Sequence, residues 1–165
     1  MEQKTWYAVY TKSRTEKKVV QQIQEQGLTA YVPLIKTMRQ WSDRKKQVEV
    51  PLISGYVFVN ILEREFYPIL NTEGIVCFVT FNGKAAAIPE KQIESLKMAV
   101  NSNLPVEICH QSFSPGEQVR VIEGPLKGVE GELLCFNGKR KLVLRLNPIG
   151  YLLKVSVNAS HVVKI

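Results

Sequence analysis

The stretch at residues 51–59, Pro-Leu-Ile-Ser-Gly-Tyr-Val-Phe-Val, constrains the fold of this chain more than any other feature. Aromatic and β-branched residues dominate its second half, which is typical of a strand buried on at least one face. Side chains alternate along a strand. The aliphatic face would hold Val57, Val59 and Ile61, and the aromatic face would hold Tyr56 and Phe58. We expect helices on the aliphatic face. The aromatic face is either core as well, or is covered by a helix, a partner protein or nucleic acid.

The composition allows a compact fold and is consistent with a negatively charged partner. The 165 residues are enough for one medium domain or two small ones. The hydrophobic content of 45% is ordinary for a protein with a real core. The net charge of +7 favours an anionic partner.

Neither a membrane span nor a redox or metal framework is predicted. The sequence has no run of about 18 apolar residues, and its first residues lack the apolar core of a signal peptide. The cysteines Cys77, Cys109 and Cys135 are far apart and form no C-x-x-C pair, so neither zinc nor a disulfide framework is supported. We expect a reduced, cytoplasmic protein without metal or cofactor.

Strand and helix patterns alternate over residues 1–100. Residues 6–11 predict a strand. Ser13 and Glu16 have capping-box spacing, and the apolar stripe that follows ends at Gly27, which predicts a helix over residues 14–26. Further strands are predicted at residues 29–35 and 75–81, further helices at residues 63–71 and after Pro89, and a hairpin turn at Asn82-Gly83. This order predicts an α+β domain, an antiparallel sheet with helices.

Residues 36–46 form a cluster of positive charge. The cations are Lys36, Arg39, Arg44, Lys45 and Lys46, with Trp41 among them and Asp43 as the single acid. Strand-like flanks predict a long β-hairpin with a basic tip. Two interpretations are open, namely a solvated hairpin whose charges protect a sheet edge, or contact with nucleic acid or an acidic partner.

The last third of the chain has an all-β pattern. Residues 101–114 contain few periodic apolar residues, which indicates a linker between a first domain at 1–100 and a second at 115–165. Beyond the linker, five short strands with tight turns, one of them at Asn137-Gly138, predict a small all-β barrel.

The sequence carries no catalytic motif. His110 and His161 have no carboxylate or cysteine partner at a recognised spacing, and adjacency of Cys109 to His110 says little about geometry. The glycines at 124 and 128 are not followed by the Lys-Ser/Thr pair of a P-loop. We expect no enzymatic activity.

Both halves resemble one family, the bacterial NusG-type transcription elongation factors, which include specialised relatives such as RfaH and the UpxY-type antiterminators. The opening strand at Trp6, the stretch at 51–59 and residues 74–89 resemble the N-terminal NGN domain. The pattern Gly116-x-x-Val119-x-Val121-x-x-Gly124-Pro-Leu-Lys-Gly128-x-x-Gly131 resembles the KOW motif of SH3-like barrels. The two occur in the family order, and the resemblance covers nearly the whole chain.

The resemblance implies two sets of binding residues. In that family the NGN domain binds the clamp helices of the RNA polymerase β′ subunit through an apolar patch, and the matching positions are Tyr10, Tyr56, Phe58 and Phe81. Positions through which RfaH-like members touch the non-template DNA strand are matched by Lys12, Lys18 and Gln22. Glu73 is acidic where the DNA-reading relative is basic, so a different DNA sequence, or none, would be read.

Charge alone adds the hairpin residues Arg39, Arg44, Lys45 and Lys46 as candidates for nucleic-acid contact. From the resemblance we expect a monomeric elongation and antitermination factor that acts on selected operons and suppresses pausing and termination. Its KOW domain would bind Rho, a ribosomal protein or nothing. The alternatives are a housekeeping NusG, or a KOW-containing RNA-binding or ribosome-associated module. The β-branched residues and glycine turns of the second domain predict a stable barrel, in contrast to the helical hairpin that RfaH can form there.

Overall fold

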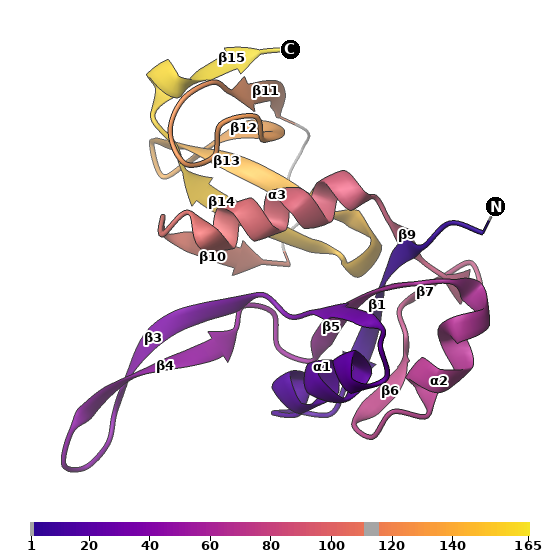
Figure 1. Ribbon diagram of the computed structural model, residues 1–165. Helices are drawn as coiled ribbons and strands as arrows, with labels where there is room; N and C mark the ends of the chain where they lie inside the picture. Colours follow the sequence, from indigo (N-terminus) through magenta and orange to yellow (C-terminus); the bar gives the residue numbers. More distant parts are fainter. Residues whose placement is uncertain (1, 111–115) are drawn as a thin grey trace. The chain divides into compact units, whose positions relative to one another are not determined.

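The computed structural model describes residues 2–110 and 116–165. By their internal packing the residues form two compact units, Met1–Ala87 and Ile88–Ile165, which are described in turn (Figure 1).

An antiparallel sheet with the strand order β2-β5-β1-β6 forms the centre of the first unit. Its strands are β1 (Thr5–Thr11), β2 (Thr29–Tyr31), β5 (Tyr56–Ile61) and β6 (Ile75–Phe78), and β9 (Ala87–Ile88) also pairs with β1. The stretch at 51–59 therefore supplies a central strand, between β2 and β1.

The aliphatic face of β5 packs on two helices, as the sequence predicts. The helices are α1 (Glu16–Glu25) and α2 (Phe66–Leu70), the latter preceded by the short η1 turn (Glu63–Glu65). Val19 and Ile23 of α1 and Ile69 of α2 are fully buried in one cluster with the valines of β5. Each such side chain stabilises the fold by about 1.5–3 kcal/mol through loss of water contact.

The aromatic face of β5 differs along its length. Tyr56 is half-buried, but Phe58 has no exposed surface. Ala8 lies opposite Phe58 on β1, and Trp6 lies two residues before Ala8 on the same strand. Both are also buried. Its ring lies 6.4 Å from that of Tyr31, measured between centroids. The expectation that Phe58 belongs to an exposed patch is therefore wrong, since this ring is part of the core.

The start of α1 departs from the predicted capping box. The side chain of the N-cap residue Thr15 makes no capping bond, and the Glu16 carboxylate turns inward, where its Oε1 accepts the backbone N–H of Gly55 at 2.9 Å. A bond to a loop distant in sequence has replaced the local one. At the other end Gly27 has φ +77°, which supports the predicted glycine stop.

Two predicted strands are each divided in the structure. Residues 29–35 split into β2 and the start of β3 (Leu34–Gln40), which pairs with β4 (Lys45–Pro51) as a separate two-stranded hairpin. Residues 75–81 split into β6 and β7 (Thr80–Phe81), and β7 pairs with β8 (Lys84–Ala85). The turn residues Asn82 and Gly83 both have positive φ, +51° and +76°, as an Asn-Gly hairpin requires.

The second unit consists of α3 (Glu90–Asn101) and a six-stranded antiparallel sheet. The strand order is β10-β14-β13-β12-β11-β15. The bounds are β10 Val106–Cys109, β11 Glu117–Val121, β12 Glu130–Phe136, β13 Lys139–Leu146, β14 Tyr151–Ser156 and β15 Val162–Lys164, with short turns at Asn147–Ile149 and Ala159–His161. The predicted β state of this part is confirmed.

The division by packing differs from the predicted domain limits in two places. Residues 106–109 of the expected linker form β10, which pairs with β14, and residues 111–115 lie outside the described part of the chain. The division by packing falls after Ala87 and not near residue 100, because α3 groups with the second unit.

The KOW-like pattern has a packing explanation. Val119, Val121, Leu126 and Val129 are all buried. A Cβ at Gly131 would lie 2.7 Å from the carbonyl oxygen of Val143 on the neighbouring strand, so only glycine fits at this point of the ladder.

One ion pair of the second unit is largely shielded from water. Glu132 on β12 accepts hydrogen bonds from Nε and Nη2 of Arg145 on β13, the latter at 3.0 Å, and from the N–H of Gly116 at 2.8 Å. The Arg145 hydrogen bonds, with help from Gly116, hold the pKa of Glu132 below its ordinary value of 4.5.

Replacing Glu132 by Gln should destabilise the protein by about 3 kcal/mol at neutral pH, because Arg145 loses its anion in a poorly hydrated place. A carboxylate with a lowered folded-state pKa stabilises the fold above its unfolded pKa, and this contribution is lost as the pH falls through the folded value. Chemical denaturation between neutral pH and about pH 3 measures both effects. The Glu132→Gln protein should lose less stability on acidification than the parent, and equal losses would contradict this role.

Replacing Phe58 by Ala should destabilise the fold by about 3–5 kcal/mol, because it leaves a cavity beside the central strand. Phe81→Ala is the matched control, since that ring is 72% exposed and should change stability by less than about 0.5 kcal/mol. Urea unfolding followed by circular dichroism compares the two. Similar midpoints would mean that Phe58 is not a core residue.

Candidate functional site

Two tyrosines lie together at the more exposed end of the aromatic face. Tyr10 of β1 lies directly opposite Tyr56 of β5, and their ring centroids are 4.9 Å apart. Tyr10 is 38% exposed and Tyr56 is half-buried. This tyrosine pair offers apolar ring surface and hydroxyl groups together, the combination that is enriched at protein interfaces.

Phe81 is exposed, but it stands apart from the tyrosine pair in secondary structure. It lies on β7, in the small β7–β8 hairpin. Within the described residues its ring contacts no other aromatic ring. Of the four expected polymerase-contact residues, the structure thus brings two together, leaves one exposed elsewhere and buries Phe58.

Residues Lys18 and Gln22 on α1 are both engaged by Glu73. Lys18 Nζ lies 3.3 Å from Glu73 Oε2, and Gln22 Nε2 donates to the Glu73 carbonyl oxygen at 3.3 Å. Lys12, just before the helix, is exposed. Two of the three expected DNA-contact side chains on this side of the helix therefore have part of their hydrogen-bonding capacity in use already.

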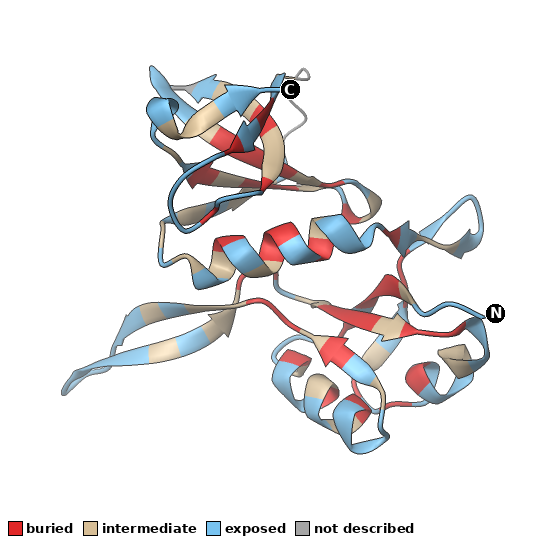
Figure 2. Cartoon of the chain, turned by 45° about the horizontal axis from the view of Figure 1, so that its top comes forward, coloured by how far each residue is buried: buried red, intermediate tan, exposed pale blue. Residues whose placement is uncertain are grey.

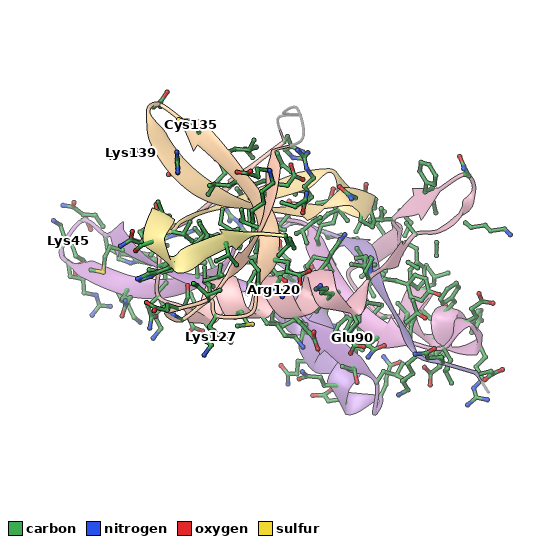
Figure 3. All side chains as sticks on the ribbon, turned by 90° about the horizontal axis from the view of Figure 1, so that it is seen from above. Lys45, Glu90, Arg120, Lys127, Cys135 and Lys139 are labelled. Atoms are coloured by element: carbon green, nitrogen blue, oxygen red, sulfur yellow. The ribbon has the colours of Figure 1, made fainter. Side chains whose placement is uncertain are left out.

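The basic hairpin presents two different faces. Residues opposite one another in a ladder share a face, and Arg39 lies opposite Lys46 while Thr37 lies opposite Val48. The other face places Lys36 opposite Glu49 and also holds Lys45. The hairpin is exposed or half-buried over most of its length (Figure 2), and Lys45 lies at its outer end (Figure 3).

At the turn of the hairpin, the Trp41 side chain is exposed, since the residue is 57% accessible to solvent. The backbone N–H of Trp41 donates to the backbone carbonyl of Arg44 at 2.7 Å. The face with Arg39 and Lys46 has no carboxylate in its ladder pairs, whereas Lys36 on the opposite face has Glu49 as its partner. Positive charge is therefore concentrated on the Arg39 face of the hairpin.

The described residues contain no group of three or more His, Cys, Asp or Glu side chains placed to hold a metal ion. Cys77, Cys109 and Cys135 are free thiols. None of the helices within residues 2–110 and 116–165 is long and apolar enough to span a membrane.

Sequence reasoning passed over two cations near the hairpin, Arg14 and Lys17. Lys17 donates from Nζ to the Glu49 carbonyl at 2.8 Å, which ties α1 to β4. No pattern in the sequence signals this proximity, because 32 residues separate the two positions.

Comparison with known proteins defines the class as a transcription factor. The family model described as "Transcription termination factor nusG" matches residues 4–97, more than half of the chain. The chain belongs to the NusG family. Members of this family are transcription factors and not enzymes.

The similarity to individual relatives extends over both units. The "Transcription termination/antitermination protein NusG" of Halalkalibacterium halodurans is 27% identical over an alignment of 180 positions, which covers 99% of each chain. The protein of the same description from Borreliella burgdorferi is 26% identical, covering 98% of this chain and 99% of the relative. The solved structure "Domain interaction in Thermotoga maritima NusG" has a TM-score of 0.52 at 20% identity and covers 98% of this chain and 97% of that one, which supports the fold.

Replacing Glu73 by Gln should strengthen binding of a single-stranded DNA oligonucleotide, because one negative charge is removed and Lys18 loses its ion-pair partner. The Lys18–Glu73 pair is exposed, so the free energy of unfolding should change by less than about 1 kcal/mol. Fluorescence anisotropy at several salt concentrations measures the affinity. Glu25→Gln is the matched control, because Glu25 lies on α1 with Lys18 but makes no ion pair with it. An equal gain in both variants would assign the effect to net charge alone.

Proposed function

We propose that this protein is a transcription elongation and antitermination factor that binds RNA polymerase through its first unit and suppresses pausing and termination on selected operons. Membership of the NusG family carries the general part of this proposal. The observation that carries the specific part is the tyrosine pair, an aromatic surface that the fold leaves accessible to solvent.

The proposed polymerase contact is the coiled coil of the β′ clamp helices, which Tyr10, Tyr56 and Phe81 would meet. A partner helix with apolar and polar side chains suits tyrosines, which combine large contact area with hydroxyl groups. Phe58 would act indirectly, by fixing the position of β5 from within the core.

The proposed mechanism is mechanical. A factor attached to the clamp and to the exposed non-template strand holds the DNA in its cleft and so disfavours the open, paused state of the polymerase. Exposed cations suit contact with phosphates, and those proposed here are Lys12, Arg39, Arg44, Lys45 and Lys46. Lys18 and Gln22 would also contact the DNA if they exchanged their interactions with Glu73 for the nucleic acid. The second unit would recruit Rho or a ribosomal protein.

The function is tested by single-round transcription on a template with a strong pause site, with and without the protein. A shorter pause in its presence supports the proposal. Binding to single-stranded RNA without retention on polymerase would favour an RNA-binding module and overturn it.

Replacing Phe81 by Ala should weaken retention on polymerase about 30-fold, which corresponds to about 2 kcal/mol for an interfacial aromatic side chain. Tyr67→Ala is the matched control, because Tyr67 is 77% exposed on α2 and is not among the proposed contact residues. Titration of labelled protein with an isolated clamp-helix coiled coil gives both affinities. Equal affinities for the two variants would remove Phe81 from the interface.

A further inference from the structure

A pocket of about 500 Å³ lies between the beginning of α1 and the β3–β4 hairpin, within the first unit. Three cations line it, namely Arg14, Lys17 and Arg39, together with the hydroxyl groups of Ser13 and Ser54. A site that combines several cations with hydroxyl donors matches the hydrogen-bonding demands of a phosphate group.

The guanidinium groups of the two arginines in the pocket have no acidic partner within the described residues. Among the described residues neither Arg14 nor Arg39 takes part in an ion pair or a side-chain hydrogen bond. Lys17 differs, since its ammonium group is held by the Glu49 carbonyl and so joins the two walls of the pocket. The pocket therefore has a fixed frame and two guanidinium groups available for an anion.

The backbone at Arg14 is in a conformation that is costly for this residue type. Its φ is +64°, in the left-handed region, which is unfavourable for a residue with a Cβ. The turn is fixed by Thr15, whose Oγ1 donates to the Lys12 carbonyl at 2.7 Å. A strained residue that is held in place beside a cavity suggests a functional position.

The single acid of the pocket, Glu16, is fixed at its wall. Glu16 is only 4% exposed, and its Oε1 accepts the N–H of Gly55. Three cations against one carboxylate leave two formal positive charges in excess. Repulsion from Glu16 would keep a bound phosphate near the two arginines.

The size of the pocket indicates a ligand larger than phosphate, because cavities of about 300–1,000 Å³ hold whole small molecules. Val50 adds an apolar wall. Val50 and Arg39 lie on the same face of the hairpin as Lys46, so the pocket continues into the basic face that runs toward Trp41. An exposed indole near a basic face is suited to stacking with an unpaired base.

We propose that this pocket binds one nucleotide of a single-stranded nucleic acid, with its phosphate against Arg14 and Arg39, and that the strand continues along the Arg39 face of the hairpin. The proposal rests on the proposed function and specifies where the strand contacts the protein. It moves the main contact away from the side of α1 where Glu73 engages Lys18 and Gln22.

The test measures how binding of a labelled single strand of about 12 nucleotides depends on salt. Arg14→Gly removes the cation and suits the left-handed backbone, and Arg39→Gln removes the second cation. Lys36→Gln is the matched control, because Lys36 is an exposed cation of the same hairpin on the opposite face. Each pocket variant should weaken binding several-fold and flatten the log–log salt slope by about 0.7, as expected for one lost phosphate contact. The control should keep the parental slope.

Circular dichroism is used to check that each variant is folded, and binding to the clamp-helix coiled coil is measured in parallel. Equal salt slopes of single-strand binding for Arg14→Gly, Arg39→Gln and Lys36→Gln would overturn the pocket assignment. If binding to the coiled coil is unchanged in these variants, the proposed function is not affected by that result. Failure of the parent protein to bind any single strand at low salt would also overturn it. DNA and RNA strands are both used, and a parallel loss for the two supports recognition of their shared phosphodiester backbone.

Discussion

Burial of both faces of one strand is the constraint on which the first unit depends. β5 lies between β2 and β1, so its backbone groups are paired on both sides. Its valines meet α1 and α2 on one face, and Phe58 is enclosed on the other. A one-residue shift in register would turn Tyr56 and Asn60 toward the helices in place of the valines, so the register of this strand is strongly fixed. The tyrosine pair is consequently presented at a fixed place, one end of a rigid ladder.

The positive charge of the chain is unevenly available. Several cations of the second unit are neutralised by nearby acids, for example Arg120 by Glu130 and Lys141 by Glu107. Near α1, Glu73 offsets Lys18. Arg14 and Arg39 have no such partner within the described residues. The hairpin and its base thus form one cluster of cations without acidic partners in the described part of the chain, and this local distribution matters more for binding than the net value.

Local signals in the sequence predicted local structure well. The alternation of β5, the Asn-Gly turns at 82–83 and 137–138, and Gly27 at the end of α1 each follow from backbone geometry that few residue types can adopt. The family and the all-β character of the second unit were also accessible from sequence. These features depend on neighbours in the chain, which a sequence displays directly.

Features that depend on distant contacts could not be predicted. Glu16 was expected to cap its own helix, but Gly55, 39 residues away, takes its carboxylate. Phe58 and Tyr56 share a face, and only the tertiary structure decides which ring is buried. The short β10 strand has no clear strand pattern in its sequence, and it forms because its backbone pairs with the edge of the sheet at β14. For the same reason the pocket at Arg14 has no sequence signature.

The hairpin contains a built-in conflict with a thermodynamic consequence. Arg39 and Lys46 lie directly opposite each other, and like charges in this position destabilise a ladder. The hairpin is a two-stranded sheet, to which the described part of the chain adds no further strand. An anion that binds between these side chains removes the repulsion, so it favours the paired form of the hairpin over a frayed one. Ligand binding and local folding are then linked, and the strand ends of the hairpin become more protected from hydrogen exchange when the site is filled. The β3–β4 hairpin would therefore be less stable in the free protein and would become ordered when the ligand binds.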